Sequence, residues 1–317
     1  MSELIRQLIK TNREEQHLTR ELLGETILSP DQLRLLENGD GKETHQNYWL
    51  LRILLGRLHL HNSSVIFYLP SKDNKLANLE MEIQRNLALW RYQKAEEQLE
   101  QFLSLIDKNN ELSFLVYYQL YTELRIRQNK KTSKDTAALH QFMENKMPNF
   151  EKRLLKGRLF SSEELSLIIA YYEYTLENIN TRMKKLFLVI HYFKTNYAGQ
   201  EKAFSFYSSL MLAYARCQYK SEEYAGCMEH CLEGLRVTNY YRCCHVTAEL
   251  YELLADSSGK LLEPKLEHKS ELTNEIQSIL QNYSAAYSLY STFYSEYQEN
   301  HKKELQKKIE KWTEIYK

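Results

Sequence analysis

Residues 18–39 read LTRELLGETILSPDQLRLLENG, a pattern that predicts two short helices joined by a tight turn. Thr19 is a candidate N-cap for the first helix. Ser29 is a stronger one for the second, because a proline follows it and Gln32 completes a capping box. Gly39 supplies the left-handed residue that ends the second helix. Together these signals predict a helix-turn-helix, a motif whose second helix enters a groove of DNA.

Two helices this short cannot fold alone, so their leucines must pack on flanking helices. We expect a first helix over residues 3–16, with an apolar face that begins at Leu4, and a fourth helix over about residues 45–60, with Trp49 in the core. A fifth apolar segment covers residues 65–69. The leucines expected in the core of this five-helix domain are Leu18, Leu22, Leu23, Leu33 and Leu36.

The polar run at residues 71–75 is the best linker candidate, so we expect a helix-turn-helix domain over residues 1–70 and a second domain over residues 76–317. A chain of 317 residues is long enough for two cores.

Composition predicts an almost entirely helical protein, because the chain has only nine Gly and four Pro. The formal net charge is zero, so no global basic field indicates nucleic-acid binding. There is no apolar run of about 18 residues and no signal-peptide pattern. We therefore expect a cytoplasmic protein without a membrane span, whose cysteines are reduced.

The rest of the chain repeats. Residues 90–95 predict a helix-loop-helix corner in which Tyr92 and Ala95 have the spacing of tetratricopeptide repeats, and residues 223–227 predict a second. Tyr92 and Tyr224 lie 132 residues apart, close to four periods of about 34 residues.

Weaker corners fall at residues 129–131 and 178–180, and Ser161 with Glu164 caps a further helix. About five hairpins stacked into a right-handed α-solenoid, whose concave face suits a peptide, fit this pattern. An irregular helical domain is the alternative.

Tyrosines follow a 4-3-4-3 spacing near the C-terminus, and the same spacing resumes after residue 300. This heptad pattern predicts one long helix. It belongs either to capping helices over residues 266–317 or to a helix that pairs two subunits. The residues of the seam are Tyr283, Tyr287, Tyr290, Tyr294, Tyr297, Leu305, Ile309, Trp312 and Tyr316.

Two four-residue stretches match the pattern of helix-turn-helix domains of the Cro/C1 (XRE) type. They are Leu18-Thr19-Arg20-Glu21 at the start of the motif and Leu36-Glu37-Asn38-Gly39 at its end. With the repeats behind it, the chain resembles the RRNPP group of Gram-positive regulators, which sense short secreted peptides. The resemblance implies a homodimeric transcription factor for quorum sensing, whose repeats bind a linear peptide and whose recognition helices read a palindromic operator in double-stranded DNA.

The sequence departs from that family where DNA contacts are expected. The usual glutamine at the start of the first motif helix is Arg20, and the usual arginine before the final motif is Leu35. Residues 1–45 carry six basic and nine acidic groups, which opposes tight DNA binding. A protein-interaction scaffold with a degenerate motif is therefore the alternative function. The DNA-facing candidates are Arg20, Ser29, Asp31, Gln32, Arg34 and Lys42.

Aromatic, basic and acidic residues alternate on the helices expected to line the concave face. Such a wall suits a short peptide, with aromatic rings for its apolar side chains and arginine for its carboxylate. Each residue alone could equally be packing or solvated surface. The candidates are Tyr171, Tyr172, Glu173, Arg216, Tyr219, Arg242, His245 and Glu249.

Five cysteines lie close together in sequence, and Cys227 and Cys231 are one helical turn apart. They could hold zinc or sense oxidants, but small buried residues at a repeat corner explain them as well. No glycine-rich phosphate loop and no hydrolase or metalloprotease motif is present. We therefore expect neither an enzyme nor a cofactor. The five are Cys217, Cys227, Cys231, Cys243 and Cys244.

Overall fold

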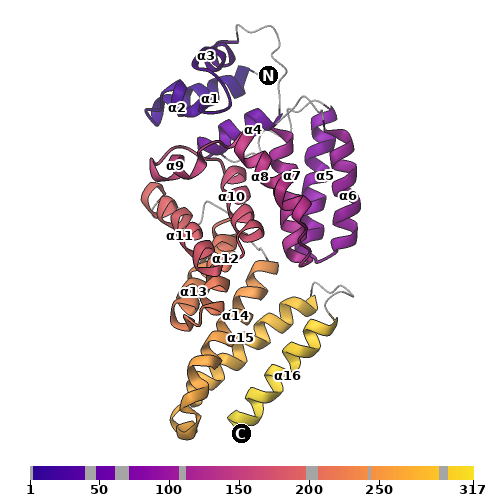
Figure 1. The fold of residues 1–317 in the computed structure, drawn as a ribbon, viewed down its shortest axis with the longest axis vertical. Helices are drawn as coiled ribbons and strands as arrows, with labels where there is room; N and C mark the ends of the chain where they lie inside the picture. The colour runs from indigo at the N-terminus through magenta and orange to yellow at the C-terminus, as the bar shows by residue number, and fades with distance from the viewer. Residues whose placement is uncertain are drawn as a thin grey trace. The chain divides into compact units, whose positions relative to one another are not determined.

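The computed structural model describes residues 3–39, 48–60, 71–106, 112–197, 206–241, 244–292 and 299–317. Across these ranges the regular structure is helical and no strand occurs, so the expected all-α class is confirmed (Figure 1). The helices are α1 (Glu3–Glu15), α2 (Arg20–Gly24), α3 (Pro30–Asn38), α4 (Tyr48–Arg57), α5 (Ser71–Ala88), α6 (Tyr92–Leu105), α7 (Ser113–Arg127), α8 (Ser133–Lys146), α9 (Phe150–Leu155), α10 (Ser162–Thr175), α11 (Ile179–Asn196), α12 (Phe206–Lys220), α13 (Tyr224–Tyr241), α14 (Cys244–Leu262), the 3₁₀ helix η4 (Glu263–Glu271), α15 (Thr273–Thr292) and α16 (Glu299–Tyr316).

The N-terminal helices share one apolar core, in which α1 packs on α3 and α2 packs on both α3 and α4. Leu18 and Leu36 lie partly buried against this core, and Leu22 is half-buried. Leu4 is 67% exposed, so the predicted apolar face of α1 narrows to Ile5, Leu8 and Ile9. The fully buried members of the core are Ile5, Ile9, Leu23, Leu33, Leu51, Leu54, Leu55 and Leu58.

Trp49 is buried as expected, with its ring 5.9 Å from that of Phe102. The fifth apolar segment at residues 65–69 lies outside the described residues. The polar run at 71–75, expected as a linker, instead forms the first turn of α5. Within it, Asn74 is half-buried and Lys75 is exposed, and apolar residues from Leu76 onward bury the rest of the helix.

The chain forms two compact units. Unit 1 comprises Met1–Gln84 with Lys94–Tyr174, and unit 2 comprises Arg85–Gln93 with Thr175–Lys317. In unit 2, consecutive helices pack side by side from α11 through α16 (Figure 1). Unit 1 therefore contains the predicted helix-turn-helix together with later helices as far as α10. No helix of the described residues combines the length and apolar character that a membrane crossing requires.

The predicted helix-loop-helix corners occur where expected. In the corner between α5 and α6, Trp90 has a φ of +55° and the Arg91 amide donates to the Asn86 carbonyl at 2.8 Å. The corner between α12 and α13 repeats this geometry, with Glu222 in the left-handed region. Such hydrogen bonds satisfy the last carbonyls of the outgoing helix while the chain reverses. Both corners therefore end one helix sharply and begin the next.

The C-terminal tyrosine seam is divided between two helices, α15, which ends at Thr292, and α16, which begins at Glu299. The two helices pack on each other. Tyr283 and Tyr290 on α15 and Leu305 and Trp312 on α16 are buried. The heptad spacing therefore arises from two packed helices that each bury one face, and not from one long helix. Tyr294 and Tyr297 lie outside the described residues.

Candidate DNA-binding and ligand-binding sites

The capped pair of helices α2 and α3 is the stretch that the sequence predicts as a helix-turn-helix. Thr19 Oγ1 accepts from the Leu22 amide at 3.1 Å. Ser29 Oγ accepts from the Gln32 amide at 3.2 Å, and Gln32 Oε1 accepts from the Ser29 amide at 2.9 Å, so the predicted capping box is complete. Gly39 ends α3 with a φ of +79°. All three local predictions are confirmed, and they fix where α3 begins and ends.

A buried carboxylate ties α1, α2 and α3 together. Glu37 accepts from Arg13 through both oxygens, at 2.6 and 3.1 Å, and from Arg20 Nε at 2.8 Å. Burial alone would raise the pKa of Glu37, but the hydrogen bonds and charges of the two guanidinium groups outweigh it and lower that pKa. The pKa of Arg13 is raised, chiefly by its hydrogen bond to Glu37.

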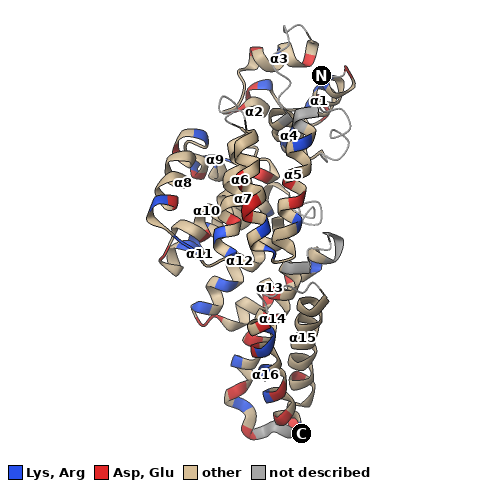
Figure 2. Ribbon diagram, turned by 90° about the vertical axis from the view of Figure 1, so that its right-hand side faces the viewer, with Lys and Arg blue, Asp and Glu red and all other residues tan. Residues whose placement is uncertain are grey.

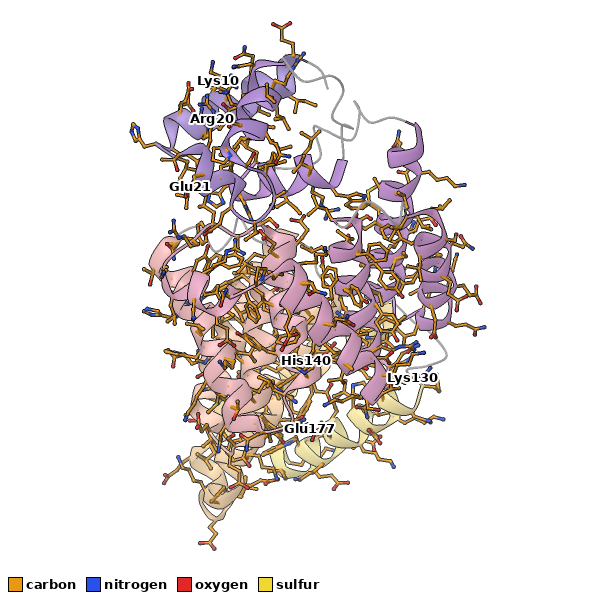
Figure 3. The ribbon with its side chains drawn as sticks, turned by 45° about the horizontal axis from the view of Figure 1, so that its top comes forward. Lys10, Arg20, Glu21, Lys130, His140 and Glu177 are labelled. Carbon is orange, nitrogen blue, oxygen red and sulfur yellow. The ribbon has the colours of Figure 1, made fainter. Side chains whose placement is uncertain are left out.

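The described DNA-facing candidates therefore fall into two groups, one held by an ion pair with a buried carboxylate and the others exposed to solvent. Arg20, labelled on α2 in Figure 3, is held by Glu37 and is only a third exposed, so it acts first as a structural residue. The side chain of Arg34 is half exposed, 3.6 Å from Asp31. Lys42 lies outside the described residues. The exposed candidates at the start of α3 are Ser29, Asp31 and Gln32.

A second buried ion pair joins the N-terminal helices to α10. Arg57, at the end of α4, is fully buried and donates to both oxygens of Glu164, at 3.1 and 2.7 Å. Its Nη1 donates to the carbonyls of Leu23 and Glu25, at 2.9 and 2.8 Å, which close the C-terminal end of α2. Glu164 also caps α10 by accepting from the Ser161 amide at 2.7 Å. Arg57 therefore links the turn between α2 and α3 to the start of α10.

Two further arginines extend this junction within unit 1. Arg52 pairs with Glu80 and, at 2.7 Å, with Glu163. Arg153 on α9 is buried and reaches Glu25 at 3.3 Å. Burial and the charge of Arg57 lower the pKa of Arg153, and the carboxylates of Glu164 and Glu25 oppose this shift.

The ligand-facing candidates on α10 lie in unit 1 and have different surroundings. Tyr172 is buried and its hydroxyl donates to Glu151 at 3.0 Å, so it is a core residue rather than a groove residue. Tyr171 is half-buried, with its hydroxyl 2.7 Å from Nδ1 of His140, which Figure 3 labels. Glu173 is half-buried beside them.

The remaining described candidates lie in unit 2. Arg216 on α12 pairs with Glu249 on α14. Tyr219 lies one turn further along α12, with its ring 5.5 Å from that of Tyr224. Arg242 and the side chain of His245 lie outside what the structure describes.

Sequence reasoning missed the centre of this group. Glu252 and Asp256 follow Glu249 on the same face of α14, and Lys308 of α16 donates to both, at 3.1 Å and 2.8 Å. His301 Nε2 lies 2.8 Å from Glu252. Figure 2 marks acidic and basic positions in colour along α14 and α16. The 3-4 spacing of the three acids was a signal that could have identified them.

Two tyrosines complete this cluster, which we call the α14 acid cluster: Glu249, Glu252 and Asp256 with their partners on α12, α15 and α16. Tyr283 donates to Asp256 at 2.6 Å, and Tyr290 donates to Glu252 at 3.3 Å. Burial, reinforced by the carboxylates, raises the pKa of both phenols. The phenols therefore remain protonated donors and hold the carboxylates in place.

The two described cysteines of α13, Cys227 and Cys231, are buried within an apolar cluster of α12, α13 and α14. Ser257 donates to Cys227 at 3.1 Å. Both cysteines therefore pack as small buried residues, which is one of the roles that the sequence predicts for them. Cys243 and the side chain of Cys244 lie outside the described part of the chain.

No protein-family model matches the chain, and no curated protein matches it either. Three solved structures are similar along nearly its whole length. PlcR of Bacillus thuringiensis, solved in complex with the peptide PapR7 and DNA, has a TM-score of 0.56 at 14% identity, over 96% of this chain and 99% of that one.

The other two are ComR proteins. The apo competence regulator ComR of Streptococcus vestibularis has a TM-score of 0.47 at 17% identity, over 94% of this chain and 95% of that one. ComR of S. thermophilus, in complex with DNA and its signalling peptide ComS, has a TM-score of 0.43 at 16% identity, over 98% and 99%. The likeness to PlcR establishes that the chain has an all-helical fold of the same kind.

Proposed function

We propose that this protein is a DNA-binding transcriptional regulator whose repeat helices bind a short signalling peptide and thereby change its DNA affinity or dimer geometry. The observation that carries the proposal is the capped α2–α3 pair, with the start of α3 exposed, in a chain that shares its fold with a regulator solved with peptide and DNA. In this proposal, residues 1–70 bind DNA and residues 76–317 sense the peptide and form the dimer. Residues 266–317 form the C-terminal capping helices.

The DNA half of the proposal assigns α3 to the major groove. Ser29 and Gln32 lie at its N-terminal end, where base edges and phosphates are contacted. Arg34 lies one turn further along α3 and would contact a guanine. A homodimer would present two such helices to a palindromic operator, with half-sites one or more helical turns apart.

The peptide half of the proposal rests on the α14 acid cluster and its neighbours. Arg216 and Tyr219 are half-buried beside three carboxylates, so charged and aromatic groups that a short peptide would engage lie close together. A peptide carboxylate would compete with Glu249 for Arg216, and a basic peptide residue would compete with Lys308 for the acids. Peptide binding would then favour one arrangement of the helices over another, by as much as its affinities for the two differ.

The first experiment selects binding sites from a library of random duplexes with the full-length protein. We expect enrichment of a palindrome, with affinity that falls steeply as salt rises. Arg34→Ala should relax the preference at one position per half-site, at a cost of about 1–3 kcal/mol. Arg91→Ala, at an exposed corner outside the motif, is the matched control. Absence of any duplex binding at low salt would favour the scaffold alternative.

The second experiment titrates pooled short synthetic peptides into the protein bound to its selected duplex. Binding of a peptide should change the DNA affinity. Arg216→Gln should lower the affinity for the peptide and leave the DNA affinity of the peptide-free protein unaltered. Peptide binding with no change of DNA affinity would remove the switch and leave the two binding activities separate.

A further inference from the structure

The helix-turn-helix segment has few basic groups, and the structure shows that two of them are already paired. Residues 1–45 carry six basic and nine acidic groups. Arg13 and Arg20 are both engaged with buried Glu37. Because neutralisation of phosphates supplies most of the non-specific affinity for DNA, this segment needs cations from elsewhere in the molecule.

The short helix α9 holds such cations next to the motif. Lys152 on α9 and Lys156 at its C-cap lie one helical turn apart and are exposed, and Arg158 follows with its side chain 43% exposed. Arg153, between them in sequence, turns inward, with its guanidinium 4.4 Å from the ring of Phe160. One side of α9 therefore anchors it, and the other side presents positive charge to solvent.

Contacts with Glu25 fix α9 against α2. Arg153 lies 3.3 Å from one oxygen of Glu25, and Arg158 lies 3.7 Å from the other. Glu25 is the C-cap of α2, and only three residues separate it from Ser29, which caps α3. Its carbonyl is in turn held by Arg57 at 2.8 Å. The basic side of α9 is thus attached to the turn that joins the two helices of the motif.

The position of α2 on DNA identifies the partner of this surface. In a helix-turn-helix the second helix enters the major groove and the first helix crosses the sugar-phosphate backbone. An element fixed at the end of the first helix therefore lies along the backbone beside the groove. We propose that the basic surface at the C-terminal end of α9, formed by Lys152 of the helix and by Lys156 and Arg158 just after it, contacts DNA phosphates outside the helix-turn-helix.

This inference rests on the proposed function, since it presumes that α3 reads DNA. It adds that binding energy without sequence preference comes from α9, in the part of the chain assigned to the repeats. Because phosphate contacts carry no sequence information, loss of the α9 lysines should weaken all duplexes alike.

The test compares the full-length protein with Lys152→Gln/Lys156→Gln by measuring affinity for the selected duplex and a scrambled one across a salt series. Each lost phosphate contact should reduce the slope of log affinity against log salt by about 0.9, so we expect a reduction of about 1.8 with the site preference unchanged. Lys152→Arg/Lys156→Arg should retain the wild-type slope.

The matched control is Lys130→Gln/Lys131→Gln, which removes the same charge from the exposed corner between α7 and α8. It should leave the slope unchanged. A slope for the α9 variant equal to that of the wild type would overturn the proposal while the DNA-binding function stands. Equal losses in the α9 and control variants would also overturn it, because general charge would then be responsible. Failure of the wild type to bind any duplex would reject both proposals.

Discussion

At the scale of single residues, Glu37 does more than complete a motif. Its carboxylate is buried, and it gathers Arg13 from α1 and Arg20 from α2 around the last turn of α3. Removal of one member of a buried ion group leaves the others charged and unpaired, which is more costly than loss of a surface pair. The orientation of α3 therefore depends on this side chain as well as on the apolar core.

We expect Glu37→Gln to lower the free energy of unfolding by about 3–5 kcal/mol, because the buried Arg13 would keep only the half-exposed carboxylate of Glu14 as a counter-charge. Urea denaturation followed by circular dichroism measures this. Glu15→Gln, at an exposed position on α1, should change stability by less than about 0.5 kcal/mol. Equal stability of the Glu37 variant and the wild type would show that the three helices are held by apolar packing alone.

At the scale of elements, α16 docks through two kinds of contact. Leu305 and Trp312 are buried, and Trp312 occupies space that Gly259 leaves open, since a Cβ there would lie 2.8 Å from the indole. The other contact is charge: His301 and Lys308 meet Glu252 and Asp256 of α14. The apolar contacts do not depend on pH, whereas the charged ones do.

The pKa of His301 is raised, first by its hydrogen bond to Glu252, with burial opposing the shift. A raised folded-state pKa means that its stabilisation is complete below the ordinary histidine value of about 6.5 and is lost as pH rises through the folded value. The lowered pKa of Glu252 sets the opposite limit, since burial is outweighed there by His301 and Lys308. Its contribution is present above the ordinary glutamate value of about 4.3 and is lost as pH falls through the lowered value.

We therefore expect His301→Gln to cost about 0.5–1 kcal/mol at pH near 6 and nothing once the histidine is neutral, because the pair is partly solvated. Urea unfolding across a pH series measures the difference between variant and wild type. His191→Gln, on the exposed side of α11, serves as the control. A difference that does not vary with pH would contradict the assignment of charge to this contact.

At the scale of the whole molecule, the buried pair of Arg57 and Glu164 makes the N-terminal helices and α10 parts of one unit. Arg57 holds carbonyls at the end of α2, and Glu164 caps the helix that carries Tyr171. A displacement of α10 would therefore move the turn before α3. This continuity is a physical route for a signal within unit 1, provided that α10 has two arrangements.

The two residues should be energetically coupled. We expect Arg57→Met and Glu164→Gln each to lower stability by about 3–5 kcal/mol, since each leaves a buried charge or donor unpaired. The double variant should lose less than the two losses together, by about 0.5–3 kcal/mol. Glutamine at 164 keeps the capping oxygen, so loss of the cap does not confuse the result. Additive losses would show that the pair does not act as a unit.

Peptide and DNA affinities should be linked in both directions. If a peptide changes the DNA dissociation constant by some factor, the operator must change the peptide dissociation constant by the same factor, commonly about 5–150-fold. Fluorescence anisotropy with labelled duplex and calorimetry with peptide measure the two sides. Unequal factors would indicate that a third equilibrium, such as dimerisation, changes between the two measurements.

Much of the fold could be predicted from local sequence. The caps at Thr19, Ser29 and Gly39 and the corner at Tyr92 depend on hydrogen bonds within a few residues, so their signals are complete in a short stretch. The prediction of a linker at 71–75 was wrong, because polar residues also begin solvated helices. The prediction of a single C-terminal helix was wrong, because heptad spacing also arises from two packed helices.

The sequence by itself determined the helical class, the capped α2–α3 pair and the corners, because each follows from propensity, spacing and local hydrogen bonds. Only the tertiary structure decided that Arg20 serves Glu37, that Tyr172 is core, and that α9 lies against the turn before α3. These facts join residues that are 17 to 128 positions apart or depend on burial between distant helices. No local pattern encodes such pairings, because which charges meet is settled by how the helices pack.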